Sequence, residues 1–265
     1  MHEKSLIFTI NSLSVQIRRA DRTEDYFAVE RIQRDIWGME GECPVPVPIL
    51  VAMNNNGGLI EVAEEGGRII GFSMAFPGKH KGREFLYSHM AGVLKEYRNM
   101  NIGYQIKMHQ FESAKLMGYN EVRWTFDPLK ARNSYFNTHK LKAFAFGYKL
   151  NYYGFMESKE NRGVESDRIE AHRYMDREPQ KIDVFIKVNL ASGSVEQSVH
   201  EDSIGIGIPA DIPQTDTALV NKWRHLTRGA ILTLEENDFV MVDVLKDGDV
   251  DYLIFSKREK SGLLR

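Results

Sequence analysis

The hydrophobic period of the sequence changes at Arg98, and this change constrains the fold more than any other feature. Before Arg98, three apolar runs at 59–65, 68–77 and 85–94 read as strands, with a Gly66-Gly67 turn between the first two. After Arg98, apolar residues recur at helical spacing until Gly118, a typical glycine stop. This pattern therefore predicts an antiparallel meander followed by a crossover helix that begins at about residue 103.

Other periodic segments place further strands and helices around this meander. A strand at 14–20 and a helix at 23–37 precede it, and three alternating prolines predict an extended loop at 43–49. A short helix that ends near residues 54–58 follows this loop. Beyond the crossover helix, we expect strands at 121–126, 148–155 and 168–175 and a helix at 133–144. The predicted fold class is α/β, an α+β mixed sheet with helices on both faces.

The composition shifts after Pro179, where we expect the main domain to end. Residues 1–178 then form one domain, and residues 179–265 form a smaller C-terminal α/β extension. In the extension we expect strands at 182–190, 205–208, 239–245 and 251–255 and a helix at 215–235. We expect the extension to pack against the main domain and to contribute to a homodimer.

Charge and cysteine content exclude several classes of protein. The chain has 35 Lys and Arg against 37 Asp and Glu, so extended binding to nucleic acid is disfavoured. Cys43 is the one cysteine, which excludes an internal disulfide and fits a reducing compartment. No apolar run approaches the roughly 18 residues of a membrane span, and the N-terminal apolar stretch is too short for a signal peptide. We therefore expect a cytoplasmic protein without nucleic-acid or membrane partners.

The turn after the third strand predicts an anion site. Amides at a helix N-terminus have no intrahelical acceptor, and the helix dipole adds positive potential there. Arg98 adds a cation, Asn101 tolerates a left-handed backbone, and Gly103 lets a phosphate approach the main chain. These residues suit a pyrophosphate, and the alternative is an ordinary capped helix. The eight histidines have no metal-ligand spacing, so we predict no metal site.

The same turn resembles a family signature. Arg98-Asn99-Met100-Asn101-Ile102-Gly103 is similar to the (Arg/Gln)-x-x-Gly-x-(Gly/Ala) motif of the Gcn5-related N-acetyltransferase (GNAT) superfamily, and Val93 and Tyr97 match the residues that lead into it. The predicted element order is also that of the superfamily over residues 14–155. Asn101 replaces the usual first glycine, a change that its tolerance of left-handed backbone makes acceptable. Segments 88–90, 132–133 and 167–168 and the C-terminal extension resemble a bacterial subgroup of mostly uncharacterised GNAT proteins.

The resemblance implies a binding site for acetyl-CoA or another acyl-CoA, which is the acyl donor. Main-chain groups of the strand end would bind the pantetheine arm, and the turn would hold the pyrophosphate. Asn133 would contact the donor as well, although it also suits a simple helix N-cap. The implied donor-binding residues are Gly92, Val93, Leu94, Arg98, Asn99, Met100, Asn101, Ile102, Gly103, Tyr104 and Asn133.

Two residues are candidates for proton transfer. His89 is the one residue of its strand that titrates near neutrality and shares strand parity with Tyr87 and Ala91, so it is the candidate base; the alternative is an ordinary strand histidine. The resemblance places a tyrosine acid on the helix after Asn133, but Thr138 occupies the usual position. Tyr135, about one turn earlier, is the candidate acid, and its alternative is a packed aromatic.

These residues predict an N-acyltransferase. The chain would bind an acyl-CoA and transfer the acyl group, most simply acetyl, to a small amine such as an amino acid by direct attack. Cys43 has no base fixed nearby in the sequence, which argues against a covalent acyl intermediate. The alternative is a non-catalytic module that binds coenzyme A as a sensor or a structural ligand.

Overall fold

The computed structural model describes residues 5–10, 13–37, 44–154, 163–183, 185–195, 202–213 and 215–264. These residues form two compact units, of which the first ends at Arg123 and the second begins at Trp124. The boundary that we expected after residue 178 lies inside the second unit. The boundary between the compact units, at Arg123, thus precedes the boundary that composition predicts. The domain boundary after residue 178 stays a prediction.

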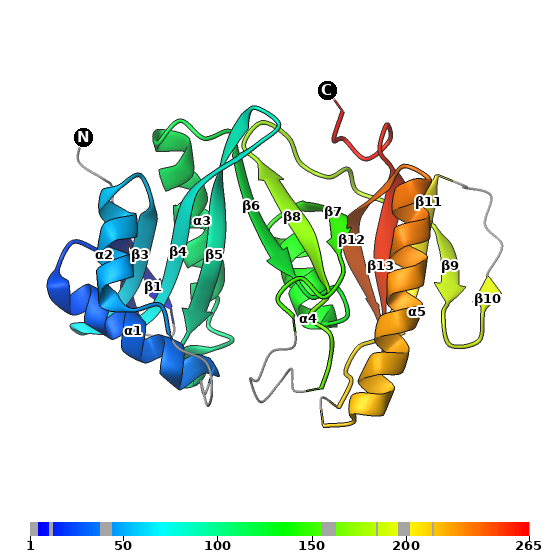
Figure 1. Ribbon diagram of the computed structural model, residues 1–265, viewed down its shortest axis with the longest axis horizontal. Helices are drawn as coiled ribbons and strands as arrows, with labels where there is room; N and C mark the ends of the chain where they lie inside the picture. The colour runs from blue at the N-terminus through cyan, green and yellow to red at the C-terminus, as the bar shows by residue number, and fades with distance from the viewer. Residues whose placement is uncertain are drawn as a thin grey trace. The chain divides into compact units, whose positions relative to one another are not determined.

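The strands of the first unit follow the order β1-β2-β3-β4-β5-β6, and β6 continues past Arg123 into the second unit (Figure 1). Neighbouring strands are antiparallel except β5 and β6, which are parallel because α3 connects them. The elements are β1 (Leu6–Ile10), β2 (Leu13–Arg19), α1 (Thr23–Trp37), α2 (Val47–Asn55), β3 (Leu59–Glu65), β4 (Arg68–His80), β5 (Arg83–Val93), a 3-10 turn (Lys95–Tyr97), α3 (Ile102–Leu116) and β6 (Glu121–Phe126).

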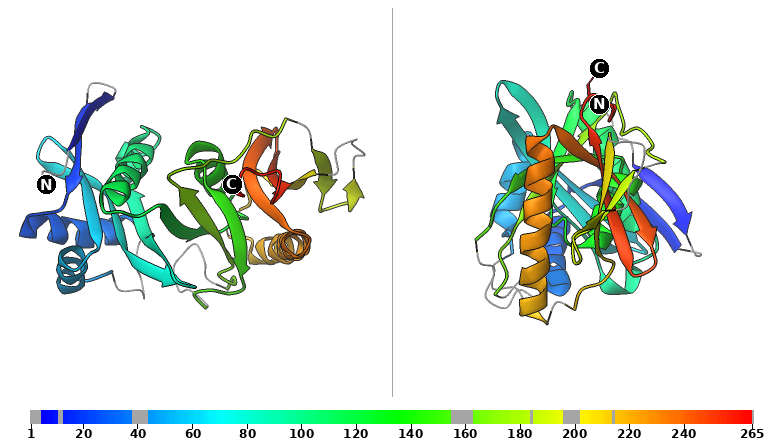
Figure 2. Two further views of the ribbon diagram at one scale, coloured as in Figure 1. Left: turned by 90° about the horizontal axis from the view of Figure 1, so that it is seen from above. Right: turned by 90° about the vertical axis from the view of Figure 1, so that its right-hand side faces the viewer.

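Helices cover both faces of this sheet, as the sequence predicted (Figures 1 and 2). On one face, α1 and α2 pack against alternate residues of β3 and β4, including Val62 and Phe72. On the other face, Ile102 and Ile106 of α3 pack against Ala63 and Ile70. The alternation of the strands therefore supplies two apolar cores, one on each side of the sheet.

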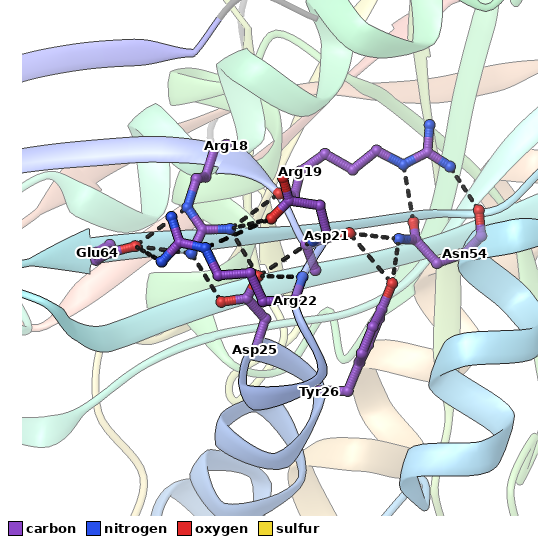
Figure 3. A network of polar contacts seen from close by, with 9 residues as sticks. Arg18, Arg19, Asp21, Arg22, Asp25, Tyr26, Asn54 and Glu64 are labelled. Atoms are coloured by element: carbon purple, nitrogen blue, oxygen red, sulfur yellow. Dashed lines mark hydrogen bonds and ion pairs between the residues drawn. The ribbon is translucent and has the colours of Figure 1, made fainter.

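A buried cluster of ion pairs fixes α1 against the sheet (Figure 3). Arg18 on β2 donates to both carboxylate oxygens of Asp25 at 2.7 Å and to Glu64 on β3 at 2.7 Å. Burial opposes the charge of Asp25, but hydrogen bonds from Arg18 and from the amides of Arg22 and Asp21 hold its pKa below the ordinary value. Asp25 also accepts hydrogen bonds from the amides of Asp21 and Arg22, the two residues that precede α1.

The second unit has the strand order β8-β7-β12-β13-β11-β9-β10, with α5 packed on β7, β11 and β12. Arg224 of α5 donates to Asp127 at 2.7 Å, and Arg228 donates to Asp167 at 2.8 Å, so buried ion pairs secure this helix. The elements are α4 (Ala131–Ser134), a π-helical turn (Tyr135–Lys140), β7 (Phe144–Lys149), β8 (Arg168–Tyr174), β9 (Ile186–Asn189), β10 (Ser194–Val195), β11 (Ser203–Pro209), α5 (Thr217–Glu236), β12 (Phe239–Asp247) and β13 (Val250–Lys257).

Two predicted elements were wrong in type or position. Residues 133–144 do not form one helix. Helix α4 begins at Ala131 and ends at Ser134, and the π-helical turn continues from Tyr135 to Lys140. The strand predicted at 148–155 lies earlier, as β7, and its pairing with β8 is irregular around Gly147, which has φ +79°. The apolar run that follows forms a turn at residues 151–153.

The proline segment and the terminal strands also differ from the prediction. Helix α2 begins at Val47, inside the segment predicted to be an extended loop, because Pro48 lies in the first turn, where an amide is not needed. Cys43 lies outside the described residues. Strands β1 and β10 were not predicted, since each is short and has no strong alternation. No helix in the described part of the chain is long and apolar enough to cross a membrane.

Candidate functional site

Strand β5 has an edge that no strand of the described chain covers over residues 88–93. Its other edge pairs with β4 from Arg83 to Val93, whereas β6 pairs with it only at Leu86 and Tyr87. Uncovered strand edges present main-chain donors and acceptors at every second residue, and an extended ligand with amides can bind them as an added strand. The predicted pantetheine contacts Gly92 and Val93 belong to this edge, and Leu94 follows directly.

A β-bulge lies in the uncovered part of β5. Met90 pairs with Met74 and Ser88 pairs with Ala75, so His89 is an extra residue between two regular pairs. A bulge bends the strand and changes the direction of the side chains that follow it, and such bulges are common beside active sites. This bulge was not predicted, because it depends on the register of β5 with β4.

The bulge places His89 in a group of rings on the α1 face of the sheet. Its ring lies 5.9 Å from that of Phe76 and 6.4 Å from that of Tyr87. Met90 packs into the core on the same face, so the predicted shared parity of His89 holds for Tyr87 but not for Ala91. The His89 side chain reaches solvent, and desolvation by the surrounding protein lowers its pKa below 6.5. At pH 7 the ring is therefore neutral and able to accept a proton.

The turn between β5 and α3 has two left-handed asparagines. Asn99 has φ 66° and Asn101 has φ 58°, and Asn101 is the residue that precedes the first turn of α3. Asparagine adopts this conformation more readily than most residues, so the turn keeps its shape without the family's first glycine. Arg98 is exposed, and its Nε donates to the carbonyl oxygen of Val93 at 3.3 Å, which ties its side chain to the end of β5.

The N-terminus of α3 has no side-chain cap and no acidic residue in its first turn. The amides at residues 102–104 thus keep the positive potential that binds anions. A Cβ atom placed on Gly103 would meet one atom within 4 Å, Cγ2 of Val93 at 3.8 Å, so the space in front of this glycine is open. Ile102 is buried and anchors the turn, whereas Met100 and Tyr104 are half-buried.

Gly92 lies close to the end of α1. A Cβ atom there would lie 2.5 Å from Cδ1 of Ile36, at the C-terminal end of α1. A side chain at this position would therefore displace the flexible end of Ile36.

Asn133 and Tyr135 lie in the second unit, and their predicted roles in donor binding and proton transfer stay predictions. The alternative role of Asn133 as a helix N-cap was wrong, because α4 begins at Ala131 and its N-cap is Lys130. Tyr135 stacks on His139 with ring centroids 4.4 Å apart, and Nζ of Lys246 lies 4.3 Å from the centre of the Tyr135 ring. Thr138, which the resemblance places at the position of the acid, is buried and donates to the carbonyl oxygen of Ser134 at 2.9 Å. These contacts fit the packed-aromatic interpretation of Tyr135.

Sequence reasoning missed a polar layer between α3 and the sheet. Glu61 on β3 is fully buried and accepts hydrogen bonds from Ser73 and Ser113, and its carboxylate lies 2.6 Å from Nδ1 of His109. Lys107 of α3 is buried beside it. One signal was available in the sequence, since Lys107 and Gln110 lie on the same helical face as Ile106 and Phe111.

The comparisons with known proteins show the fold. No family model matches this chain, and no curated protein matches it. Among solved structures, yncA of Salmonella typhimurium, a candidate acetyltransferase solved with its cofactor acetyl-CoA, gives a TM-score of 0.50 at 16% identity over 61% of this chain and 94% of that one. An acetyltransferase of the GNAT family from Streptococcus pneumoniae gives 0.49 at 14% identity, over 61% and 99%. An IAA acetyltransferase from Bacillus cereus gives 0.46 at 20% identity, over 61% and 100%.

Proposed function

We propose that this chain, which has the fold of the GNAT acetyltransferases, is an acyl-CoA-dependent N-acyltransferase. In this proposal it is most specifically an N-acetyltransferase that acts on a small amine such as an amino acid. The observation that carries the proposal is the uncapped start of α3, preceded by the left-handed Asn101 and located beside the uncovered edge of β5. An anion site next to free strand amides matches the two chemical parts of coenzyme A, its pyrophosphate and its pantetheine amides.

The donor would bind through groups that the first unit presents together. The amides at residues 102–104 and the Arg98 guanidinium would hold the pyrophosphate, with Gly103 leaving room for it. Asn99, Met100 and Asn101 shape the turn. The main chain of β5 from Gly92 would pair with the pantetheine arm. The contact from Asn133 is proposed from the family resemblance alone.

The transfer needs a proton acceptor and a proton donor. A substrate ammonium first loses a proton, and its nitrogen then attacks the thioester carbon, forming the C–N bond. The C–S bond breaks, the amide nitrogen loses its second proton, and the thiolate of coenzyme A takes up one proton. We assign the acceptor role to His89, because its lowered pKa leaves it neutral at pH 7. Tyr135 stays the proposed donor, on the strength of the resemblance.

A second candidate is a coenzyme A sensor without catalysis. One observation favours it, the hydrogen bond that Thr138 donates to the carbonyl oxygen of Ser134. The resemblance places Thr138 at the position of the family's acid, and its hydroxyl proton is already donated to the main chain. Donor binding alone does not separate this candidate from the enzyme.

Two measurements test the proposal in sequence. Acetyl-CoA at 100 times its Kd should stabilise the chain by about 2.7 kcal/mol in thermal unfolding, and the Arg98→Ala variant should need more ligand for the same shift. Thiol release from acetyl-CoA should then be measured over a panel of amino acids, polyamines and aminoglycosides. The absence of a thermal shift contradicts both candidates, whereas binding without thiol release favours the sensor.

A further inference from the structure

A buried lysine connects the two elements that supply the candidate site in the first unit. Lys107 of α3 is 5% exposed, and its Nζ lies 2.8 Å from the hydroxyl oxygen of Ser88 on β5. Its second partner is the side-chain oxygen of Gln110 at 2.7 Å. Lysine is rarely buried because the loss of hydration is costly, so an apolar residue would suit this helix face better for stability alone.

The positions of the two partners relate them to the proposed chemistry. Ser88 directly precedes the bulge residue His89, and it lies on the α3 face while His89 lies on the α1 face. Lys107 lies one helical turn after Gly103, in the helix whose N-terminus forms the proposed phosphate site. The hydrogen bond from Lys107 to Ser88 therefore fixes the middle of β5 to the start of α3.

We propose that Lys107 and Ser88 are positioning residues that hold the β5 bulge, and with it His89, in a fixed place relative to the turn before α3. This inference deepens the proposed function and rests on it for the role of His89. Neither residue needs to touch a substrate, since both act through the backbone of β5.

The protonation of Lys107 makes this connection sensitive to pH. Burial lowers its pKa to about 7, and attraction to Glu61 on β3 opposes that effect. His109, on the same helix, lies against the carboxylate of Glu61, while β4 and β5 present the neutral hydroxyls of Ser73 and Ser88. An ammonium donates a charge-assisted hydrogen bond about twice as strong as that of a neutral amine. As pH rises through about 7, Lys107 loses its charge, and its hydrogen bond to Ser88 should weaken.

The direct test is an NMR titration of the His89 ring, which needs neither donor nor amine. The ring resonance should show two inflections in the natural chain, one from His89 itself below pH 6.5 and one near pH 7 from Lys107. Lys107→Met and Ser88→Ala should each remove or weaken the second inflection. Lys115→Met, which changes an exposed lysine of the same helix, is the matched control and should keep it. A single inflection in the natural chain, or a second one unchanged in both variants, overturns the proposal.

A kinetic measurement distinguishes positioning from simple structural support. With any amine that the natural chain acetylates, Lys107→Met should lower kcat about tenfold while acetyl-CoA affinity stays within about threefold. If Lys107→Met does not fold, Ser88→Ala keeps the buried lysine and gives the same readout. An equal loss of affinity and kcat overturns positioning of His89. If acetyl-CoA does not bind the natural chain, the proposed function fails while the titration still decides whether Lys107 and His89 are coupled.

Discussion

The starts of α1 and α3 use polar residues in opposite ways. At α1, the carboxylate of Asp25 accepts hydrogen bonds from the amides of Asp21 and Arg22, and Arg18 neutralises it. At α3, no side chain caps the helix, its first turn has no acidic residue, and the preceding Asn101 has a left-handed backbone. The start of α1 thus contains a carboxylate that is bonded within the protein, whereas the start of α3 has no acidic side chain and retains its positive potential.

This difference separates a structural polar site from a candidate binding site. A buried cluster with all partners present stabilises the fold and leaves nothing for a ligand to bind. An uncapped helix start next to an uncovered strand edge leaves amides that an anion can bind. Removing the partner of Asp25 at α1 should therefore change stability alone, and blocking the open amides of α3 should change donor binding with little effect on stability.

The largest expected effect is at Gly103. Gly103→Val should weaken acetyl-CoA binding at least 1,000-fold, about 4.1 kcal/mol, because the added carbons occupy the open space beside Val93. Stability should change by less than about 1 kcal/mol, because the position tolerates a Cβ and valine is a slightly better helix residue than glycine. Calorimetry and urea unfolding measure the two quantities. Gly229→Val, at an open helical glycine in α5, is the control, and retained affinity in Gly103→Val would remove the turn from the donor site.

The matching change at α1 is Arg18→Met. Removing this guanidinium leaves Asp25 buried without its partner, so the free energy of unfolding should fall by about 3–5 kcal/mol. Acetyl-CoA affinity of the folded variant should not change. Because the folded-state pKa of Asp25 is lowered, its contribution is present above pH 3.8 and is lost as pH falls below it. The deficit measured by urea unfolding should therefore shrink in acid.

The exposed Arg22 gives the control for this variant. Its side chain is 59% exposed and its ion pair with Glu64 spans 3.9 Å, so Arg22→Met should cost less than about 1 kcal/mol. Equal losses in the two variants would contradict the view that burial, and not charge count, makes the α1 cluster stabilising.

A smaller effect is expected at His89, which belongs to the binding side of the comparison. His89→Asn should lower kcat about 100-fold and leave acetyl-CoA affinity unchanged, because a base acts on the amine and not on the donor. The rate of the natural chain should fall as pH drops below the lowered pKa of His89, since the protonated ring accepts no proton. The same pH profile in His89→Asn would exclude His89 as the base.

Local patterns in the sequence predicted most of the first unit. The helix at Thr23–Trp37 and the strands at Leu59–Glu65 and Glu121–Phe126 lie where the period placed them, and the mixed fold is confirmed. The turn at Asn101 was also predictable, because its conformation depends on residue type and immediate neighbours.

The features that were not predicted depend on contacts between distant residues. The bulge at His89 arises from register with β4, and the partners of Lys107 and Glu61 come from different strands and α3. In the second unit, a π-helical turn takes the place of a regular α-helical end. The hydrophobic period of so short a segment does not distinguish a π-helix from an α-helix. These features orient the side chains of the candidate site. The sequence therefore predicted the conformation of the turn before α3 better than the surroundings of His89.

The smallest expected effect concerns the backbone of Asn101. Asn101→Gly should leave both stability and acetyl-CoA affinity nearly unchanged, because glycine adopts φ 58° freely and restores the family's usual residue. Asn101→Val should cost about 1–2 kcal/mol of stability, because a branched side chain is strained in the left-handed region. Its effect on affinity should follow only from distortion of the turn. If Asn101→Gly loses affinity as Gly103→Val does, the asparagine side chain itself binds the donor, and the contrast with α1 then includes a side chain as well as main-chain amides.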